Sequence, residues 1–183
     1  MTKNPSQVLK DEHTVIKKMQ DIIYAIDLRW NNNPEKYEAL VNKLIHFFRE
    51  YSDRFHHHKE ELVLFEEMRR HPDFALVEII DVLEDHHEMF REYTREISRD
   101  LQAKNYERVQ ATLHKYIHQL LDHIAVEDDE LFGMAEQVFS ENELERIYFK
   151  FQDIDLELGE KVKKELEQYP SDIMKEIDLK LQS

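Results

Sequence analysis

The sequence predicts an all-α protein, an up-down-up-down four-helix bundle with an extra C-terminal helical segment. The chain of 183 residues holds only two glycines and four prolines, which leaves few tight turns for strands joined in hairpins. Glutamate, lysine, leucine and glutamine are abundant, and all four are good helix formers. Apolar residues recur every three or four positions in four long stretches, and the short connections between them favour antiparallel neighbouring helices.

The first helix is expected over residues 6–30, with Pro5 just ahead of it as a plausible start. Leu9 and Ile16 lie near one helical stripe, and His13 takes a position in that stripe where a leucine would be expected. Three asparagines and a proline follow, and they break the helix.

The second helix is expected over residues 35–70. Leu44 and Phe48 mark its buried side, and His56 and Glu60 sit at the edge of this apolar stripe or within it. A His-Pro-Asp sequence follows and ends the helix.

The third helix is expected over residues 73–104. Leu83 and Phe90 lie on its buried face. His86 and His87 both follow Leu83 by a helical step, so the sequence does not decide which of the two points inward.

The fourth helix is expected over residues 106–138. Leu120, His123, Glu127 and Leu131 recur along it at spacings of three and four. A histidine and a glutamate therefore again stand in core positions.

The C-terminal segment begins with the sequence SENE, a capping-box pattern that starts a helix. Gly159 and Pro170 interrupt it, so one or two further helices are expected. We expect them to pack on the bundle, so that residues 1–183 form a single domain with the bundle over 6–139 and the extension over 140–183.

Composition excludes several classes of function. The formal net charge of −15 repels phosphate backbones and anionic lipids, so we expect neither nucleic acid nor a membrane as a partner. The absence of cysteine removes disulfides, zinc–thiolate sites and thiol catalysis. No apolar run reaches membrane-spanning length and the N-terminus has no signal-peptide core, so a cytoplasmic location is expected.

One motif occurs twice: a histidine, three residues, a glutamate, three residues, and a Leu-Phe pair. The first copy is HHHKEELVLF at 56–65 and the second is HIAVEDDELF at 123–132. A histidine and a glutamate four residues apart share one face of a helix. Two such pairs on two helices can aim four ligand atoms at one point, which is the pattern of a metal site.

The polar residues at core positions need binding partners, because burying a carboxylate or an imidazole without one costs free energy. These positions are His13, His56, Glu60, His86 or His87, His123 and Glu127. A fully satisfied network of hydrogen bonds between histidines and glutamates is one solution. One or two divalent cations are a better one, and nitrogen and oxygen ligands without sulfur suit iron, manganese or zinc. Two carboxylates from different helices can each bridge two metals.

Four segments of the chain resemble the hemerythrin-like, or HHE cation-binding, family over about residues 7–140. They are DEH around His13, FREYSDRFHHHKEELVLF, LEDHH, and YIHQLLDHIAVEDDELFGMAEQVFS. The resemblance implies a four-helix bundle that holds two iron ions in a non-haem di-iron centre, with carboxylate and oxo or hydroxo bridges. It implies imidazole ligands at His13, His56, His86 and His123, and bridging carboxylates at Glu60 and Glu127.

The sequence departs from the classical oxygen carriers on the third helix. Those proteins place two histidines four apart there, whereas Phe90 and Arg91 follow His86 and His87 in this chain. The remaining ligand is therefore left open, and His57, His87, Asp128 or a nearby tyrosine are candidates.

Taken together, these features predict a non-haem di-iron protein that binds or senses dioxygen or a related small ligand, nitric oxide or peroxide. Iron storage or delivery, or repair of damaged iron centres, is an alternative. A di-iron oxidase or peroxidase is another, and a helical interaction module without metal is the last. The sequence does not decide whether the protein is an enzyme, and it names no protein partner.

Overall fold

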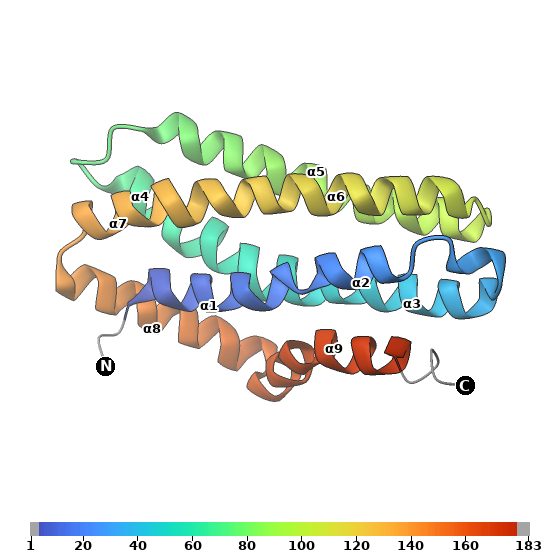
Figure 1. The fold of residues 1–183 in the computed structure, drawn as a ribbon. Helices are drawn as coiled ribbons and strands as arrows, with labels where there is room; N and C mark the ends of the chain where they lie inside the picture. The colour runs from blue at the N-terminus through green and yellow to red at the C-terminus, as the bar shows by residue number, and fades with distance from the viewer. Residues whose placement is uncertain (1–3, 179–183) are drawn as a thin grey trace.

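The computed structural model describes residues 4–178, and within this range every regular element is a helix, as predicted. Residues 5–138 form four long helical rods that run side by side along one axis, and residues 141–178 form two further helices that lie along one side of them (Figure 1). None of the helices in the described range is long and apolar enough to span a membrane.

The first rod comprises α1 (Pro5–Lys17), α2 (Met19–Ala25) and the 3-10 turn η1 (Arg29–Asn31). The side chain of Asn4 starts it by accepting a hydrogen bond of 2.9 Å from the backbone N–H of Ser6. The predicted first helix is therefore divided into two α-helices and a short turn.

The second rod is one continuous helix, as predicted, but its winding changes along its length. It begins as α3 (Pro34–Phe47), where Asn33 caps the first turn, and continues through the π-helical segments η2 (Phe48–His57) and η3 (Glu60–Leu64). It ends as α4 (Phe65–Arg70). The π-helical winding lies at the first copy of the repeated motif, and short π-helical stretches are frequent at functional sites.

The third and fourth rods form a long antiparallel pair. The third is α5 (Val77–Gln102), and a tight turn with Lys104 at φ 56° leads into the fourth. The fourth comprises α6 (Tyr106–Val126), the π-helical segment η4 (Glu127–Leu131) and α7 (Phe132–Val138). The second copy of the motif therefore has the same π-helical winding as the first.

The C-terminal segment forms two helices, α8 (Glu141–Leu158) and α9 (Glu160–Asp178). The predicted capping box between Ser140 and Glu143 is present at the start of α8. Gly159 separates the two helices with φ 104°, a conformation that residues with a side chain rarely adopt. Helix α8 packs on α1, and α9 packs on α2, α3 and η2, so this segment lies against the first two rods.

The core contains two apolar clusters with a polar layer between them. The larger cluster lies toward α2 and the first part of α3, and the smaller one toward α4, α7 and α8. On each rod the polar layer falls between the residues of the two clusters. Its fully or almost fully buried polar residues are Glu12, His13, His56, His57, Lys59, Glu60, His87, His123 and Glu127.

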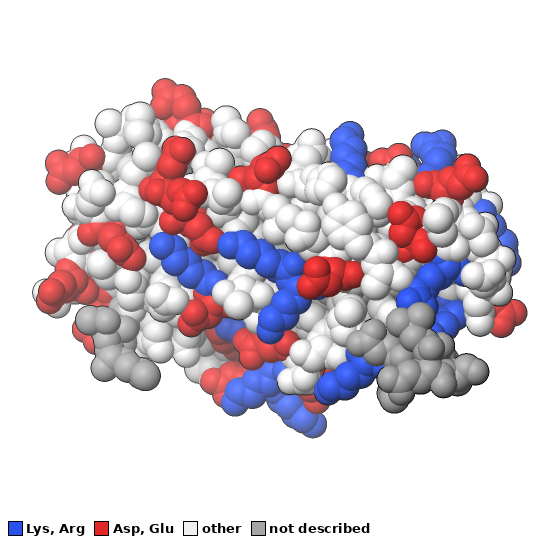
Figure 2. Space-filling model, in the orientation of Figure 1, with Lys and Arg blue, Asp and Glu red and all other residues white. Residues whose placement is uncertain are grey.

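On the face of the molecule that Figure 2 shows, lysines and arginines stand next to aspartates and glutamates, mostly in the middle and lower part of the view. Other acidic side chains, toward the upper left, stand apart from any basic one, in keeping with the formal net charge of −15.

Candidate metal centre

Two groups of buried side chains in the polar layer have the composition of metal sites. The two-histidine group consists of His13, His56, Glu60 and Glu127. The three-histidine group consists of His57, His87, His123 and Glu60. In each group, one ligand atom from every member lies within 4.8 Å of all the others.

All four rods contribute to these groups. The first rod supplies His13, the second His56, His57 and Glu60, the third His87, and the fourth His123 and Glu127. Five of the positions that the resemblance implies are thus brought together, and the two further candidates, His57 and His87, join them.

The structure places His86 outside both groups. Its side chain is half-buried, and its Nδ1 lies 3.4 Å from Nδ1 of His123, on the side of that ring away from the centre. The neighbouring His87 is fully buried, and its Nε2 lies 3.1 Å from Nε2 of His123. The third rod therefore presents His87, not His86, to the centre, and its ligand role stays a prediction.

Glu60 and Glu127 each reach both groups. The Glu60 oxygens lie 3.5 Å from Nε2 of His56 on one side and 3.5 Å from Nε2 of His87 on the other. The Glu127 oxygens lie 3.3 Å from Nε2 of His13 and 3.0 Å from Nε2 of His123. This is the arrangement expected of two bridging carboxylates.

The carboxylate oxygens of Glu60 and Glu127 lack hydrogen bonds. Both side chains are fully buried, and among the described residues none of their four oxygens accepts a hydrogen bond, although imidazole nitrogens stand close by. A buried ion without a partner is costly. Divalent cations between the two groups would satisfy these oxygens, so the residues present fit a pair of metal ions.

The imidazole pairs have the spacing of ligands to one ion. Nε2 of His13 lies 2.9 Å from Nε2 of His56, and the corresponding distance between His87 and His123 is 3.1 Å. Two nitrogens that bind one ion at about 2.1 Å stand about 3.0 Å apart at a right angle and about 3.4 Å apart at the tetrahedral angle. The spacing therefore fits one ion between the members of each pair.

Carboxylates hold the outer nitrogens of four of the imidazoles. Nδ1 of His13, His56, His57 and His87 contacts Asp128, Glu12, Asp53 and Glu61, respectively, at 2.8–3.2 Å. An ionised carboxylate only accepts hydrogen bonds, so each Nδ1 donates its proton outward. The lone pair of Nε2 is then free to bind a metal, as in the carboxylate–histidine–metal arrangement of many sites.

Cations stand behind these outer carboxylates. Lys17 contacts Asp128 at 2.8 Å, and Arg91 contacts both Asp53 and Glu61 at 2.7 Å. Glu12 contacts two ammonium groups, which are described below with the C-terminal helices. The imidazoles of the centre are thus held by carboxylates, and these carboxylates are held in turn by cations.

The Leu-Phe pair of each motif closes the centre on one side. Phe132 stacks on His13 with a centroid distance of 5.7 Å, and Phe65 stacks on His87 at 5.9 Å. Each phenylalanine thus covers a histidine from a rod other than its own. In both motifs the backbone N–H of the phenylalanine donates to the carbonyl of the glutamate five residues earlier, the hydrogen bond of a π-helix.

Burial shifts the pKa values of four groups in this layer toward their neutral forms. Burial and the nearby charge of Glu127 raise the pKa of Glu60 well above its usual value. Burial and His13 lower the pKa of His56 to about 4. Burial also lowers the pKa of His57 and of His123. These three imidazoles are therefore neutral at physiological pH, the form that binds metal.

Two imidazoles are shifted in the opposite direction. Burial lowers the pKa of His13, but Asp128 and Glu127 outweigh it and raise the value overall. The same holds for His87, whose pKa Glu127 and Glu61 raise. Without a metal these rings attract protons, because they lie among carboxylates. A metal cation in the centre would replace those protons and supply the positive charge that the carboxylates attract.

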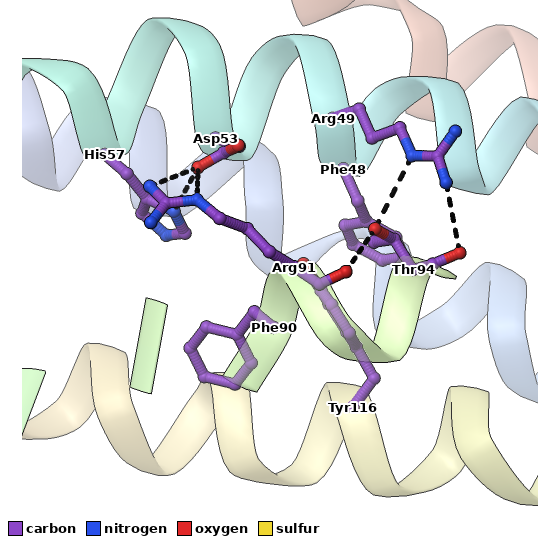
Figure 3. A pocket seen from close by; sticks show the side chains of 8 residues that line it. All are labelled: Phe48, Arg49, Asp53, His57, Phe90, Arg91, Thr94 and Tyr116. Atoms are coloured by element: carbon purple, nitrogen blue, oxygen red, sulfur yellow. Dashed lines mark hydrogen bonds and ion pairs between the residues drawn. The ribbon is translucent and has the colours of Figure 1, made fainter. Parts of the chain in front are cut away.

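A small pocket lies on the outer side of the three-histidine group (Figure 3). Apolar rings, including Phe48 and Phe90, line it together with His57 and two arginines. Arg91 reaches across its mouth to Asp53, and Arg49 donates to the backbone carbonyl of Thr94 at 3.3 Å. The aspartate that contacts His57, Asp53, therefore reaches the surface of the molecule together with Arg91.

The sequence profile of the hemerythrin HHE cation-binding domain matches residues 4–135, which is more than half of the chain. The chain belongs to the hemerythrin family. The match covers the first three rods and the fourth rod as far as residue 135, inside α7, so it includes every member of the two groups and ends before α8 and α9. No curated protein sequence and no solved structure matches the chain significantly.

Several residues around this hemerythrin-family centre were missed by reasoning from the sequence. Glu12 had a signal, because it directly precedes His13 in the DEH segment. Asp53 had another, because it lies four residues before His57 on the same helix. Lys59 lies inside the repeated motif, but nothing in its neighbours indicated that a lysine there would be fully buried.

Proposed function

We propose that this hemerythrin-family protein is a non-haem di-iron protein that binds or senses dioxygen or a related small ligand, nitric oxide or peroxide. One observation carries the proposal: two fully buried carboxylates, Glu60 and Glu127, reach both histidine groups with four oxygens that accept no hydrogen bond within the described part of the chain. Two cations shared by two bridging carboxylates would satisfy all four oxygens.

The donor set supports iron as the metal. Imidazole nitrogens and carboxylate oxygens without any sulfur suit iron, and the sequence contains no cysteine. Iron held here would supply an open coordination position and redox chemistry for a small ligand.

The side chains around the centre hold and orient its ligands. The outer carboxylates fix the imidazole rings with Nε2 inward, and the apolar clusters on both sides of the layer restrict access of water. Glu127 also contacts His123 of the three-histidine group, so both carboxylates reach both groups, and the two-histidine side has four candidate ligand residues against five on the other side. We therefore assign the small ligand to the two-histidine side.

The test is the metal content and optical spectrum of protein expressed anaerobically in iron-replete medium. We expect about two iron ions per chain and an absorption change on oxygenation that reverses when oxygen is removed. The double variant Glu60→Ala/Glu127→Ala serves as the control and should bind no iron. Protein without stoichiometric iron would contradict the proposal.

The same experiment separates the alternatives. Irreversible oxidation with turnover of peroxide would replace the proposal with a di-iron oxidase or peroxidase. Ready transfer of iron to a metal-free acceptor protein would replace it with iron storage, delivery or repair. A matched titration with nitric oxide distinguishes a sensor of that ligand from one of dioxygen.

A further inference from the structure

Behind His56 lies a buried cluster of four charged side chains that includes residues of both C-terminal helices. Glu12 uses one oxygen, Oε2, to accept a hydrogen bond of 3.0 Å from Nδ1 of His56. Its other oxygen, Oε1, lies 2.8 Å from the ammonium of Lys59 and 2.6 Å from that of Lys163. The carboxylate that orients His56 is therefore itself held by two cations.

Asp155 completes the cluster. Its two oxygens lie 2.5 Å from the ammonium of Lys59 and 2.6 Å from that of Lys163. Each carboxylate thus contacts both ammonium groups, and the two negative and two positive charges balance. Lys59 is fully buried and the side chain of Lys163 is only 13 % exposed.

The cluster joins segments that are far apart in the sequence. Glu12 lies on α1 and Lys59 between the π-helical segments of the second rod, whereas Asp155 lies on α8 and Lys163 on α9. The backbone break at Gly159 lets α9 turn so that Lys163 returns to Asp155, eight residues earlier. The C-terminal helices therefore reach the shell directly outside a proposed metal ligand.

Removal of one of the four charged side chains would leave the cluster with a buried net charge. Glu12 is almost fully buried, and its carboxylate is held by His56, Lys59 and Lys163. A buried ion pair that loses one partner leaves an uncompensated charge, which strongly disfavours the arrangement. Loss of Lys163 would therefore displace or neutralise Glu12 and free the His56 ring to rotate.

We infer that Asp155 and Lys163 are positioning residues of the metal centre, which act through Glu12 on His56 and couple docking of α8 and α9 to metal binding in the two-histidine group. The inference rests on the proposed function, because it takes the two groups as metal sites. Coupling of this kind is reciprocal, so metal in the two-histidine group also stabilises the docked C-terminal helices.

The test is a titration of metal-free protein with Co²⁺, followed by its visible absorption, in wild type and in Lys163→Met. We expect Lys163→Met to weaken Co²⁺ binding in the two-histidine group about tenfold, as is typical when the outer partners of a ligand are lost. Binding in the three-histidine group, recognised as the event abolished in His87→Ala, should stay within about twofold. Lys161→Met is the matched control, since Lys161 lies on the same helix with its side chain 90 % exposed.

A double-variant cycle tests whether Lys163 acts through Glu12. Glu12→Gln/Lys163→Met should bind Co²⁺ no more weakly than Glu12→Gln alone, because the second change removes a contact to a charge already gone. Lys163→Arg keeps the charge and should restore most of the affinity. A general defect in folding would instead lower both binding events and the thermal stability of the metal-free variant.

Hydrogen exchange of α9 gives a second readout. In wild type, Co²⁺ should slow exchange of the α9 amides, and in Lys163→Met this protection should disappear. The inference would be overturned if Lys163→Met binds Co²⁺ as tightly as wild type, or if the effects of Glu12→Gln and Lys163→Met on the Co²⁺ affinity multiply in the double variant. Either result would leave the proposed metal centre intact. Wild-type protein that takes up no Co²⁺ would overturn the proposed function, and the inference with it.

Discussion

The two histidine groups share their carboxylates but differ in what surrounds them. The two-histidine group is backed by the buried cluster around Glu12, which the C-terminal helices help to build. The three-histidine group is backed by Asp53 and Glu61, which share the guanidinium of Arg91, a side chain that is 27 % exposed. His56 of the two-histidine group is thus held by buried charges that include a residue of the C-terminal helices. The other histidine of this group, His13, is backed by Asp128 and the partly exposed Lys17, and in this respect it resembles the histidines of the three-histidine group.

This difference predicts that the two groups would hold a metal ion in different ways. Three imidazoles would hold an ion by direct ligation, so we expect the three-histidine group to depend less on its outer carboxylates and cations. The two-histidine group has fewer imidazoles, and one of them, His56, is oriented by buried charges, so we expect this group to depend on them more. The predictions below test this contrast, from the largest expected effect to the smallest.

The largest effect is expected for the carboxylates that both groups share. Glu60→Ala and Glu127→Ala should each lose at least one of the two proposed ions, because each of these carboxylates contacts imidazoles of both groups. Metal content after dialysis against buffer without free metal measures this loss. Glu130→Ala is the matched control, since Glu130 lies exposed on the same π-helical segment as Glu127. Retention of both ions in both variants would refute the bridging role.

The next effect separates His87 from His86. His87→Ala should abolish binding in the three-histidine group and leave one ion in the two-histidine group. His86→Ala removes only a contact to the outer nitrogen of His123, so both ions should remain, with at most a few-fold loss of affinity. Isothermal titration of the metal-free variants with Co²⁺ measures both. Equal losses in the two variants would contradict the placement of the third rod.

These two histidines also show where prediction from the sequence ends. The periodicity of apolar residues was sufficient for the helical rods, and the fold is the predicted all-α bundle with C-terminal helices. His86 and His87 follow Leu83 by three and four residues, and both steps are helical. The choice between them depends on the rotation of α5 about its axis, which packing against the other rods decides and which no local pattern encodes.

The remaining parts of the site depend on features with weak or no sequence signals. His56 and His57 are adjacent, yet they enter different groups, in a stretch where the π-helical winding of the second rod replaces the ordinary helical register. Asp155 and Lys163 lie about a hundred residues from Lys59 and follow the last histidine in the chain, His123. Their position near the centre depends on how the C-terminal helices dock, and no local pattern in the sequence predicts it.

Removal of metal should lower the free energy of unfolding, and the loss should increase with the number of groups that are emptied. A ligand that binds only the folded state at a hundred times its dissociation constant adds about 2.7 kcal/mol to the free energy of unfolding. We expect a loss of this order for each vacated group in urea unfolding after chelation. His56→Ala and His87→Ala, each limited to one group, should show about half of the metal-dependent stabilisation of wild type. Identical unfolding curves with and without metal would contradict a structural contribution of either group.

The smallest effect is expected for Arg91, the cation behind the three-histidine group. Its contacts to Asp53 and Glu61 are partly exposed, and exposed ion pairs contribute about 0–1 kcal/mol, which corresponds to at most about fivefold in affinity. Arg91→Met should therefore weaken Co²⁺ binding in the three-histidine group by less than about fivefold, and added salt should reduce the difference.

Arg95→Met is the control for this substitution. Arg95 lies one turn further along α5 and pairs with Glu88 and Glu92, so its loss should leave both Co²⁺ affinities unchanged. The comparison with Lys163→Met then decides between the two outer shells. If Arg91→Met weakens Co²⁺ binding in the three-histidine group tenfold or more at high salt, Arg91 holds His57 and His87 as firmly as the buried cluster holds His56. The contrast between the groups would then be wrong. If the loss is small and salt-dependent, burial of the outer charges, rather than their number, determines how strongly an outer shell acts on the centre.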